Sequence, residues 1–149
     1  MKKLHILLLF LFSSIILFGQ DTVSQDIVNK LRLHERLFIE KINQERVKRN
    51  LGVVSFDKGI YDTFSTPHAI YMSEVLNVLH ASNGVGECVG GVFYNGGLTL
   101  SDDCVTQFKD SEEGHWDDLM LKHIQIMSIR MEYAIWDGTE TVYVCVNFK

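Results

Sequence analysis

Hydrophobic and polar positions follow a helical period through the first half of the chain. From residue 24 to 50, apolar residues recur every three or four positions with charges between them, which predicts an amphipathic helix. A second helical pattern runs from about residue 57 to 79. Pro67 interrupts it, so this helix either kinks there or restarts with Thr66 as its cap and Pro67 at its first position.

The second half of the chain has a different pattern. Residues 84–97 are rich in glycine, which favours short β elements joined by turns, and they contain no phosphate-binding glycine motif. Residues 101–123 return to a helical pattern. Residues 124–136 and 141–148 are rich in Ile, Val, Tyr and Met around an Asp-Gly-Thr turn, which is typical of a β-hairpin. This order of elements predicts an α+β fold of packed layers.

The N-terminus has the features of a signal peptide. Lys2 and Lys3 form a basic start, an apolar run covers residues 6–18, and Gly19 offers a small residue for cleavage. The run is shorter than the roughly 20 residues of a spanning helix, although an uncleaved anchor is the alternative. No cysteine stands directly after the apolar run, which excludes a lipoprotein anchor at that site. We expect residues 1–19 to be removed and the mature chain to be secreted or periplasmic, without a stable membrane anchor.

Composition and charge narrow the functional classes. The 149 residues are 46% hydrophobic and 22% charged, which suits one globular domain. The net charge is −5, and loss of Lys2 and Lys3 leaves twelve basic against nineteen acidic residues, a mature charge of −7. This sign disfavours neutralisation of a phosphate backbone, so no nucleic-acid partner is expected. We expect a monomer.

Three cysteines follow the signal, in a compartment where disulfides persist. Because three is odd, at most one pair forms and one thiol is left. Cys88 with Cys104 is the favoured disulfide, since the loop between them is short and crosses a glycine-rich segment. A pairing of Cys88 with Cys145 across neighbouring strands is the competitor. Otherwise Cys145 is expected to be a small core residue.

Several short motifs occur in an order that one protein family shares. They are an Asn-x-x-Arg pair at Asn43 and Arg46, Leu79-His80, Gly86-Glu87, Ser111 ahead of His115, and the strand-like segment 142–148. In this order the chain resembles the CAP superfamily, also called the SCP-like extracellular domain, in its bacterial form. The resemblance covers residues 36–149, which leaves residues 20–35 as an N-terminal helical lead-in. It implies a three-layer α/β/α sandwich with a central antiparallel sheet and a large cleft.

The resemblance also implies a site. In the family, residues matching His80, Glu87 and His115 line the cleft, and the two histidines can hold a divalent metal. Two neutral imidazoles suit Zn²⁺, and Glu87 could orient a histidine or order a bound water. Ser111 occupies the cleft position where many eukaryotic members have a second glutamate.

The chain departs from the family pattern at three places. Cys88 replaces the asparagine of Gly-Glu-Asn, Phe108 replaces a tryptophan, and the segment from Ser111 to His115 is one residue longer than usual. Glu112 or Glu113 could substitute for the missing acid, although two solvated carboxylates are the favoured interpretation.

The remaining matched residues are expected to be structural. Arg46 would hydrogen-bond backbone or a carboxylate, and Asn43 would brace the loop after residue 52. His34, His68 and His123 match no family position and are expected to be surface or packing residues.

Two functions follow from these residues. The first is an exported CAP-domain protein whose cleft binds a small ligand, peptide or divalent metal without turnover, requiring no cofactor beyond a possible Zn²⁺. The alternative is a zinc-dependent hydrolase with His80 and His115 as ligands and Glu87 as base. A Cys-His peptidase using Cys88 or Cys104 ranks last, because a disulfide would consume the thiol. The sequence leaves the identity of the ligand and the existence of enzymatic activity open.

Overall fold

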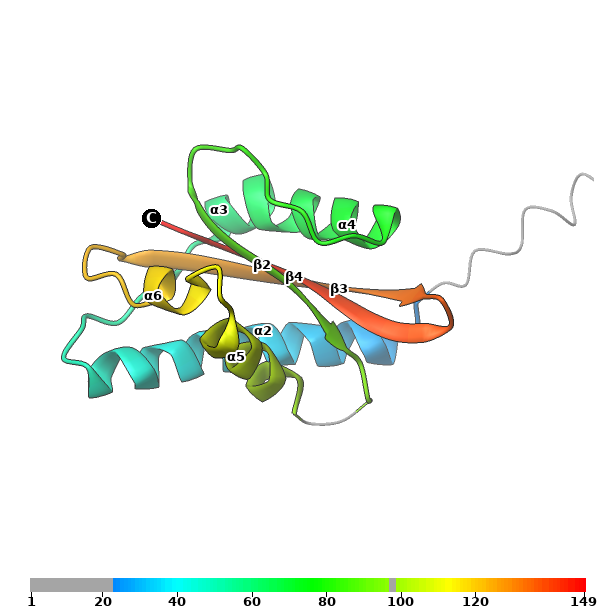
Figure 1. Cartoon of the computed structure of the whole chain (residues 1–149), viewed down its shortest axis with the longest axis horizontal. Coiled ribbons are helices and arrows are strands. Elements are labelled where there is room, and N and C mark those ends of the chain that lie inside the picture. Colours follow the sequence, from blue (N-terminus) through cyan, green and yellow to red (C-terminus); the bar gives the residue numbers. More distant parts are fainter. Residues whose placement is uncertain (1–22, 97–98) are drawn as a thin grey trace, which may run out of the picture.

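A four-stranded sheet divides the protein into layers (Figure 1). The computed structural model describes residues 23–96 and 99–149, so the expected signal peptide lies outside the described residues. The strand order is β1-β3-β4-β2, with β1 Ser55–Phe56, β2 Gly86–Phe93, β3 Ile126–Trp136 and β4 Thr139–Phe148. The three long strands are antiparallel, as expected, and the short β1 adds a parallel pairing to β3.

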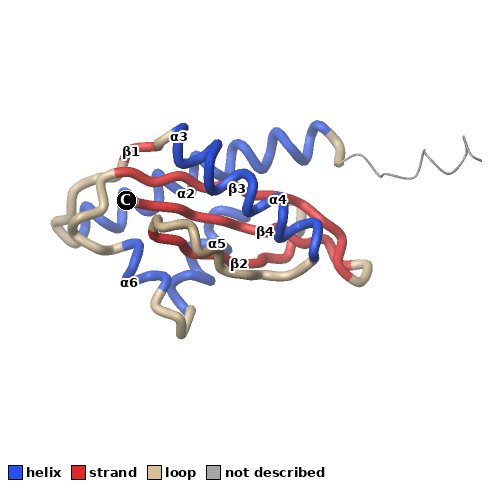
Figure 2. The backbone as a smooth tube through the Cα atoms, turned by 90° about the horizontal axis from the view of Figure 1, so that it is seen from above, coloured by secondary structure: helices blue, strands red, loops and turns tan. Residues whose placement is uncertain are grey.

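Helices cover both faces of this sheet (Figures 1 and 2). One face carries α2, α5 and α6, and the opposite face carries α3, the π-helix η2 and α4. Their bounds are α2 Gln25–Lys48, α3 Lys58–Ile60, η2 Tyr61–Ser65, α4 Thr66–Val75, α5 Leu100–Asp110 and α6 His115–Leu119. The expected α/β/α sandwich is confirmed. No described helix is long and apolar enough to cross a membrane.

Helix α2 is one continuous element. The side chain of Ser24 caps it by accepting from the Ile27 N–H, and its apolar face buries Leu31, Phe38 and Ile42. Most of the helical lead-in expected over residues 20–35 is the first part of this helix. From its first turn onward this segment belongs to the helix, and its inner face packs in the core.

The second helical segment is divided differently from the expectation. The π-helix η2 precedes Pro67, and α4 follows with Pro67 in its first turn, where a missing N–H is tolerated. Thr66 does not cap a new helix, because the chain passes from η2 into α4 with helical backbone throughout. The helix ends at Val75, short of the expected residue 79, because Leu76 adopts a left-handed conformation with φ +54°.

Two core clusters lie on opposite faces of the sheet. The larger cluster joins the sheet to α2, α5 and α6, and the smaller one joins it to α4. The glycine-rich segment forms one continuous strand instead of several short ones. The helix expected over residues 101–123 is two helices, since the chain turns at Gly114, whose φ of +80° suits glycine.

Arg46 and Asn43 hold irregular segments against the end of α2. Arg46 is fully buried and donates to the backbone carbonyls of Gly52, Leu119, Leu121 and Ile124 at 2.7–3.2 Å. The Asn43 amide group donates to the Val54 carbonyl at 2.9 Å, and its oxygen accepts from the Val54 N–H at 2.7 Å. Both side chains satisfy backbone groups that no helix or strand pairs.

The cysteines do not form the expected disulfide. Cys88, Cys104 and Cys145 are buried free thiols. Cys88 packs in the larger cluster and donates weakly to the His115 carbonyl at 3.6 Å, and Cys104 packs in the same cluster from α5. Cys145 belongs to the cluster on the opposite face of the sheet, which also excludes the competing Cys88–Cys145 bridge. Each thiol fills space as a small apolar residue.

Candidate metal centre

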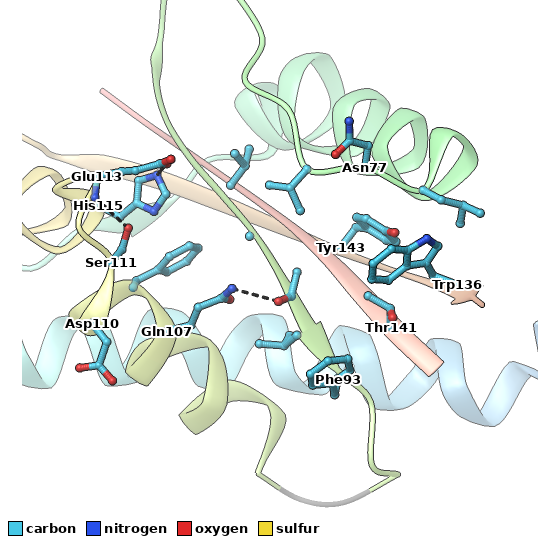
Figure 3. Close-up of a pocket in the computed structure, with 17 residues that line it drawn as sticks. Asn77, Phe93, Gln107, Asp110, Ser111, Glu113, His115, Trp136, Thr141 and Tyr143 are labelled. Atoms are coloured by element: carbon cyan, nitrogen blue, oxygen red, sulfur yellow. Dashed lines mark hydrogen bonds and ion pairs between the residues drawn. The ribbon is translucent and has the colours of Figure 1, made fainter. Parts of the chain in front are cut away.

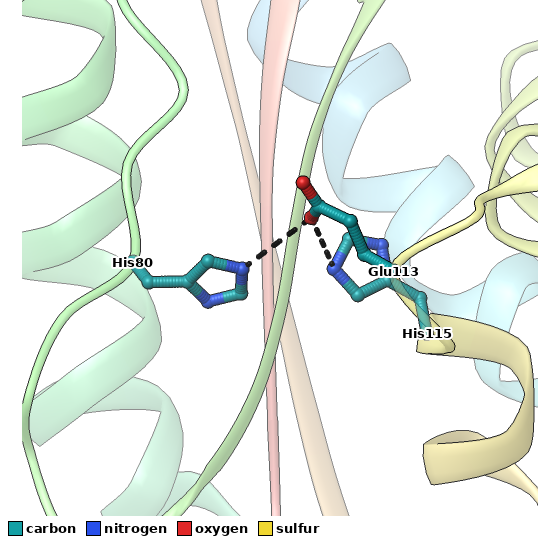
Figure 4. Close-up of side chains that lie close together, drawn as sticks. All are labelled: His80, Glu113 and His115. Carbon is teal, nitrogen blue, oxygen red and sulfur yellow. Dashed lines mark ion pairs between the residues drawn. The ribbon is translucent and has the colours of Figure 1, made fainter.

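Three potential metal ligands converge beside β2 from two connections, one on each face of the sheet (Figure 4). His80 lies in the loop between α4 and β2, Glu113 lies in the turn between α5 and α6, and His115 opens α6. Their ligand atoms all lie within 4.8 Å of one another. The Glu113 Oε2 is 3.3 Å from the His115 Nε2 and 3.8 Å from the His80 Nε2. Two ligands of one tetrahedral Zn²⁺ lie about 3.3 Å apart, so a small movement of the exposed His80 and Glu113 would close the site.

His115 is the anchored member of this group. It is 6% exposed, and its ring meets Phe108 edge-on at 5.4 Å between centroids. Burial lowers the pKa of its imidazole, which keeps the ring neutral at neutral pH. Its Nε2 is buried without a hydrogen-bond partner among the described residues, because the nearby Glu113 carboxylate lies outside hydrogen-bond geometry. A buried, unpartnered imidazole nitrogen that faces a carboxylate and a second imidazole fits a divalent metal.

Glu87 lies behind His80 rather than among the converging ligand atoms. Its buried carboxylate accepts from the Ala81 N–H at 2.8 Å and lies 3.3 Å from the Nδ1 of His80. This leaves the Nε2 of His80 toward Glu113. Of the two roles that the family resemblance implied for Glu87, the geometry favours orientation of a histidine, since a ligating imidazole is commonly held by a carboxylate at its other nitrogen.

His68 and Glu113 lie closer to the candidate site than the favoured expectation for either residue. The Nε2 of His68 lies 2.6 Å from the Leu79 carbonyl and 3.9 Å from the Glu87 carboxylate, so it braces the loop that carries His80. The Glu113 side chain is 71% exposed, in line with the expected solvated carboxylate, and it also faces both imidazoles. The available signal was its proximity, because Glu113 is two residues from His115 in the same short connection.

The candidate metal centre lies at one end of an elongated groove of about 610 Å³ (Figure 3). Ser111, Glu113 and His115 line this end, and Phe93 and Trp136 line the other (Figure 3). Between them, residues 89–93 of β2 run along the groove. His123 is exposed and lies outside it, and His34 is buried, accepting from the Ser101 N–H at 3.3 Å. The observed groove has the volume of a small-molecule or peptide site.

Comparison with solved structures agrees with this architecture. An outer surface protein from Borrelia burgdorferi superposes with a TM-score of 0.57 at 15% identity, covering 78% of this chain and 92% of that one. MpPR-1i, a pathogenesis-related protein of the CAP superfamily, superposes with a TM-score of 0.50 at 18% identity, covering 85% and 90%. The chain has a CAP-like fold. No family model and no curated protein sequence matches it.

Within the CAP-like fold, the sandwich brings together segments that are far apart in the sequence. The loop after α4 and the turn after α5 meet over β2, and this meeting places His80 opposite His115, with 5.7 Å between ring centroids. The two solved neighbours bear on the fold alone. The metal centre therefore rests on the geometry of this chain's own residues.

Proposed function

We propose that the chain is an exported binding protein whose groove holds a divalent metal ion at His80, Glu113 and His115, without turnover. The observation that carries the proposal is the convergence of three ligand atoms within 4.8 Å around the buried, unpartnered Nε2 of His115. Two neutral imidazoles and one carboxylate suit Zn²⁺ and leave a coordination position open. Export is supported by the apolar N-terminal run, which favours a secreted or periplasmic location.

Binding without turnover is favoured over the two catalytic alternatives. The hydrolase hypothesis needs Glu87 as base, but its carboxylate already accepts from the Ala81 backbone and faces the far nitrogen of His80. The peptidase hypothesis needs a thiolate. Burial raises the pKa of the Cys88 and Cys104 thiols well above the ordinary value, which opposes a nucleophilic role.

Zinc titration of the mature chain tests the proposed site. We expect one equivalent of Zn²⁺ to bind by calorimetry and to raise the melting temperature, because a ligand of the folded state stabilises it by about 2.7 kcal/mol at a hundredfold excess over Kd. Substitution His115→Ala or Glu113→Gln should weaken binding at least tenfold. The matched control is Glu112→Gln, an exposed acid one residue earlier that should leave binding unchanged. Metal binding should weaken as the pH falls, because protons compete with the ion for its ligand atoms.

Two results would contradict this proposal. Equal effects of Glu112→Gln and Glu113→Gln would mean that only net charge attracts the ion. Turnover of a peptide or ester panel, lost both with a chelator and in Glu87→Gln, would favour the hydrolase.

A further inference from the structure

We infer that the free edge of β2 binds an extended peptide with a basic residue, which pairs along the groove as an additional strand. This inference rests on the proposed function as a binding protein and names the class of its ligand. It is carried by the backbone edge, the walls and the charges of the groove, one end of which also holds the proposed metal ligands Glu113 and His115.

The outer backbone edge of β2 faces the groove. β2 ends the sheet, and no second strand pairs with it among the described residues. The Tyr94 N–H donates to the Glu140 carbonyl at 2.9 Å, so by the alternation of an antiparallel ladder the even-numbered residues of β2 point toward β4. Val89, Gly91 and Phe93 therefore direct their backbone groups outward, and all three line the groove. Such an edge is a template for an added strand.

The walls beside this edge leave room for one chain. A Cβ at Gly91 would lie 3.3 Å from the Val78 side chain, and a Cβ at Gly90 would lie 2.8 Å from the Gln107 side chain. The two glycines thus let the loop after α4 and helix α5 approach β2 from opposite faces. A single extended peptide fits between these walls, whereas the sheet edge of a second copy would bring its own flanking loop and helix.

Gln107 already hydrogen-bonds the outer backbone edge of β2, as an added strand would. Its side-chain amide donates to the outward carbonyl of Gly91 at 2.9 Å. This contact supplies to β2 the kind of hydrogen bond that a neighbouring strand would make. An incoming peptide would pair with the outward groups of Val89 and Phe93 on either side of it.

The charges and exposed side chains of the groove indicate the sequence of the peptide. No lysine or arginine lines the groove, whereas Asp110 and Glu113 lie at one end of it (Figure 3). Asp110 is not among the metal ligands, so its carboxylate stays available to a basic residue of the peptide when a metal is bound. At the other end, Phe93 is 71% exposed and Trp136 is 54% exposed, as expected for aromatic contacts that await a partner. A basic residue and apolar side chains match these two ends.

Peptide binding to the mature chain tests the inference, with and without Zn²⁺. The probe is a fluorescein-labelled hexapeptide of alternating valine and threonine with a lysine at each end. Its binding is measured by fluorescence anisotropy. We expect it to bind, and its glutamate-ended counterpart to bind at least tenfold more weakly. Trp136→Ala should weaken binding at least fivefold. Ile135→Ala is the matched control, since it is 52% exposed on the same strand but does not line the groove.

The strand pairing itself is tested by N-methylation and amide exchange. Two versions of the peptide are compared, one methylated at the odd-numbered backbone nitrogens and one at the even-numbered. One version should lose binding and the other should keep it, because only one set of N–H groups faces β2. Bound peptide should slow hydrogen exchange at the outward amides of Val89, Gly91 and Phe93. Equal binding of both methylated peptides, or equal binding of the lysine and glutamate probes, would overturn the inference. So would sedimentation showing that the chain dimerises through this edge.

The outcomes separate this inference from the metal proposal. If neither hexapeptide binds the mature chain while zinc still binds, also in Trp136→Ala, peptide recognition is refuted and the metal proposal stands. Peptide binding without any zinc binding refutes the metal site and leaves the β2 edge as the functional surface.

Discussion

At the scale of single residues, Arg46 shows how a buried charge can serve the fold without a carboxylate partner. Its guanidinium donates to four backbone carbonyls, one after α2 and three from the end of α6 onward, so removing it would take a hydrogen-bond donor from each of them. We predict that Arg46→Met lowers the free energy of unfolding by about 3 kcal/mol or more, measured by urea denaturation. The exposed Arg36 provides the control, and Arg36→Met should change stability by less than about 0.5 kcal/mol. Similar losses in the two variants would contradict the structural role of Arg46.

Glu87 and Glu113 show how little a residue type alone determines its role. Both are glutamates near a histidine in the sequence. The backbone N–H of Ala81 holds Glu87 behind His80, whereas the turn before α6 presents Glu113 to both imidazoles. The roles follow from which neighbours each carboxylate meets.

At the scale of elements, a buried carboxylate joins α2 to β3. Glu35 accepts from the Met131 N–H at 2.8 Å and pairs with Arg32, while burial raises its pKa to about 7. Between about pH 4.5 and 7 the folded chain holds a proton that the unfolded chain has released. The stabilising contribution of Glu35 is therefore complete below about pH 4.5 and is lost as the pH rises through 7.

This titration gives a measurable pH dependence. From about pH 5 to 8, the wild-type chain should lose on the order of 2 kcal/mol of unfolding free energy relative to Glu35→Gln, which cannot ionise there. Urea denaturation of both proteins across this range measures the difference. Parallel pH profiles would show that Glu35 keeps an ordinary pKa in the folded state.

The elements also show where local pattern is sufficient. Helix α2 and the β3–β4 hairpin lie close to the expected bounds, since each has strong periodicity and clear turn residues. The π-helix η2 was not predicted, because its wide turn depends on a distant partner. That turn lets the Ser65 hydroxyl contact the Ser128 hydroxyl at 2.6 Å and the Asn147 side chain at 2.9 Å. These two residues lie on the neighbouring strands β3 and β4.

At the scale of the whole molecule, the sheet separates the three cysteines into two cores. We predict that the mature chain has three free thiols in denaturant and none that reacts rapidly when folded, because burial raises the pKa of each thiol. Titration with a thiol reagent, before and after unfolding without reductant, measures both values. A single thiol in the denatured, unreduced chain would instead support the Cys88–Cys104 disulfide that the sequence favoured.

The sequence by itself determined the layered α+β class, the long first helix and the terminal hairpin. These features depend on periodicity and spacing within short segments, which neighbouring residues encode directly. Only the tertiary structure decided that Glu113 faces both imidazoles, that Glu87 stands behind His80 and that the cysteines remain apart. It alone also showed that β2 keeps a free edge in the groove. Each of these outcomes is a relation between segments distant in the chain, and packing against the sheet sets the relation after the local elements have formed.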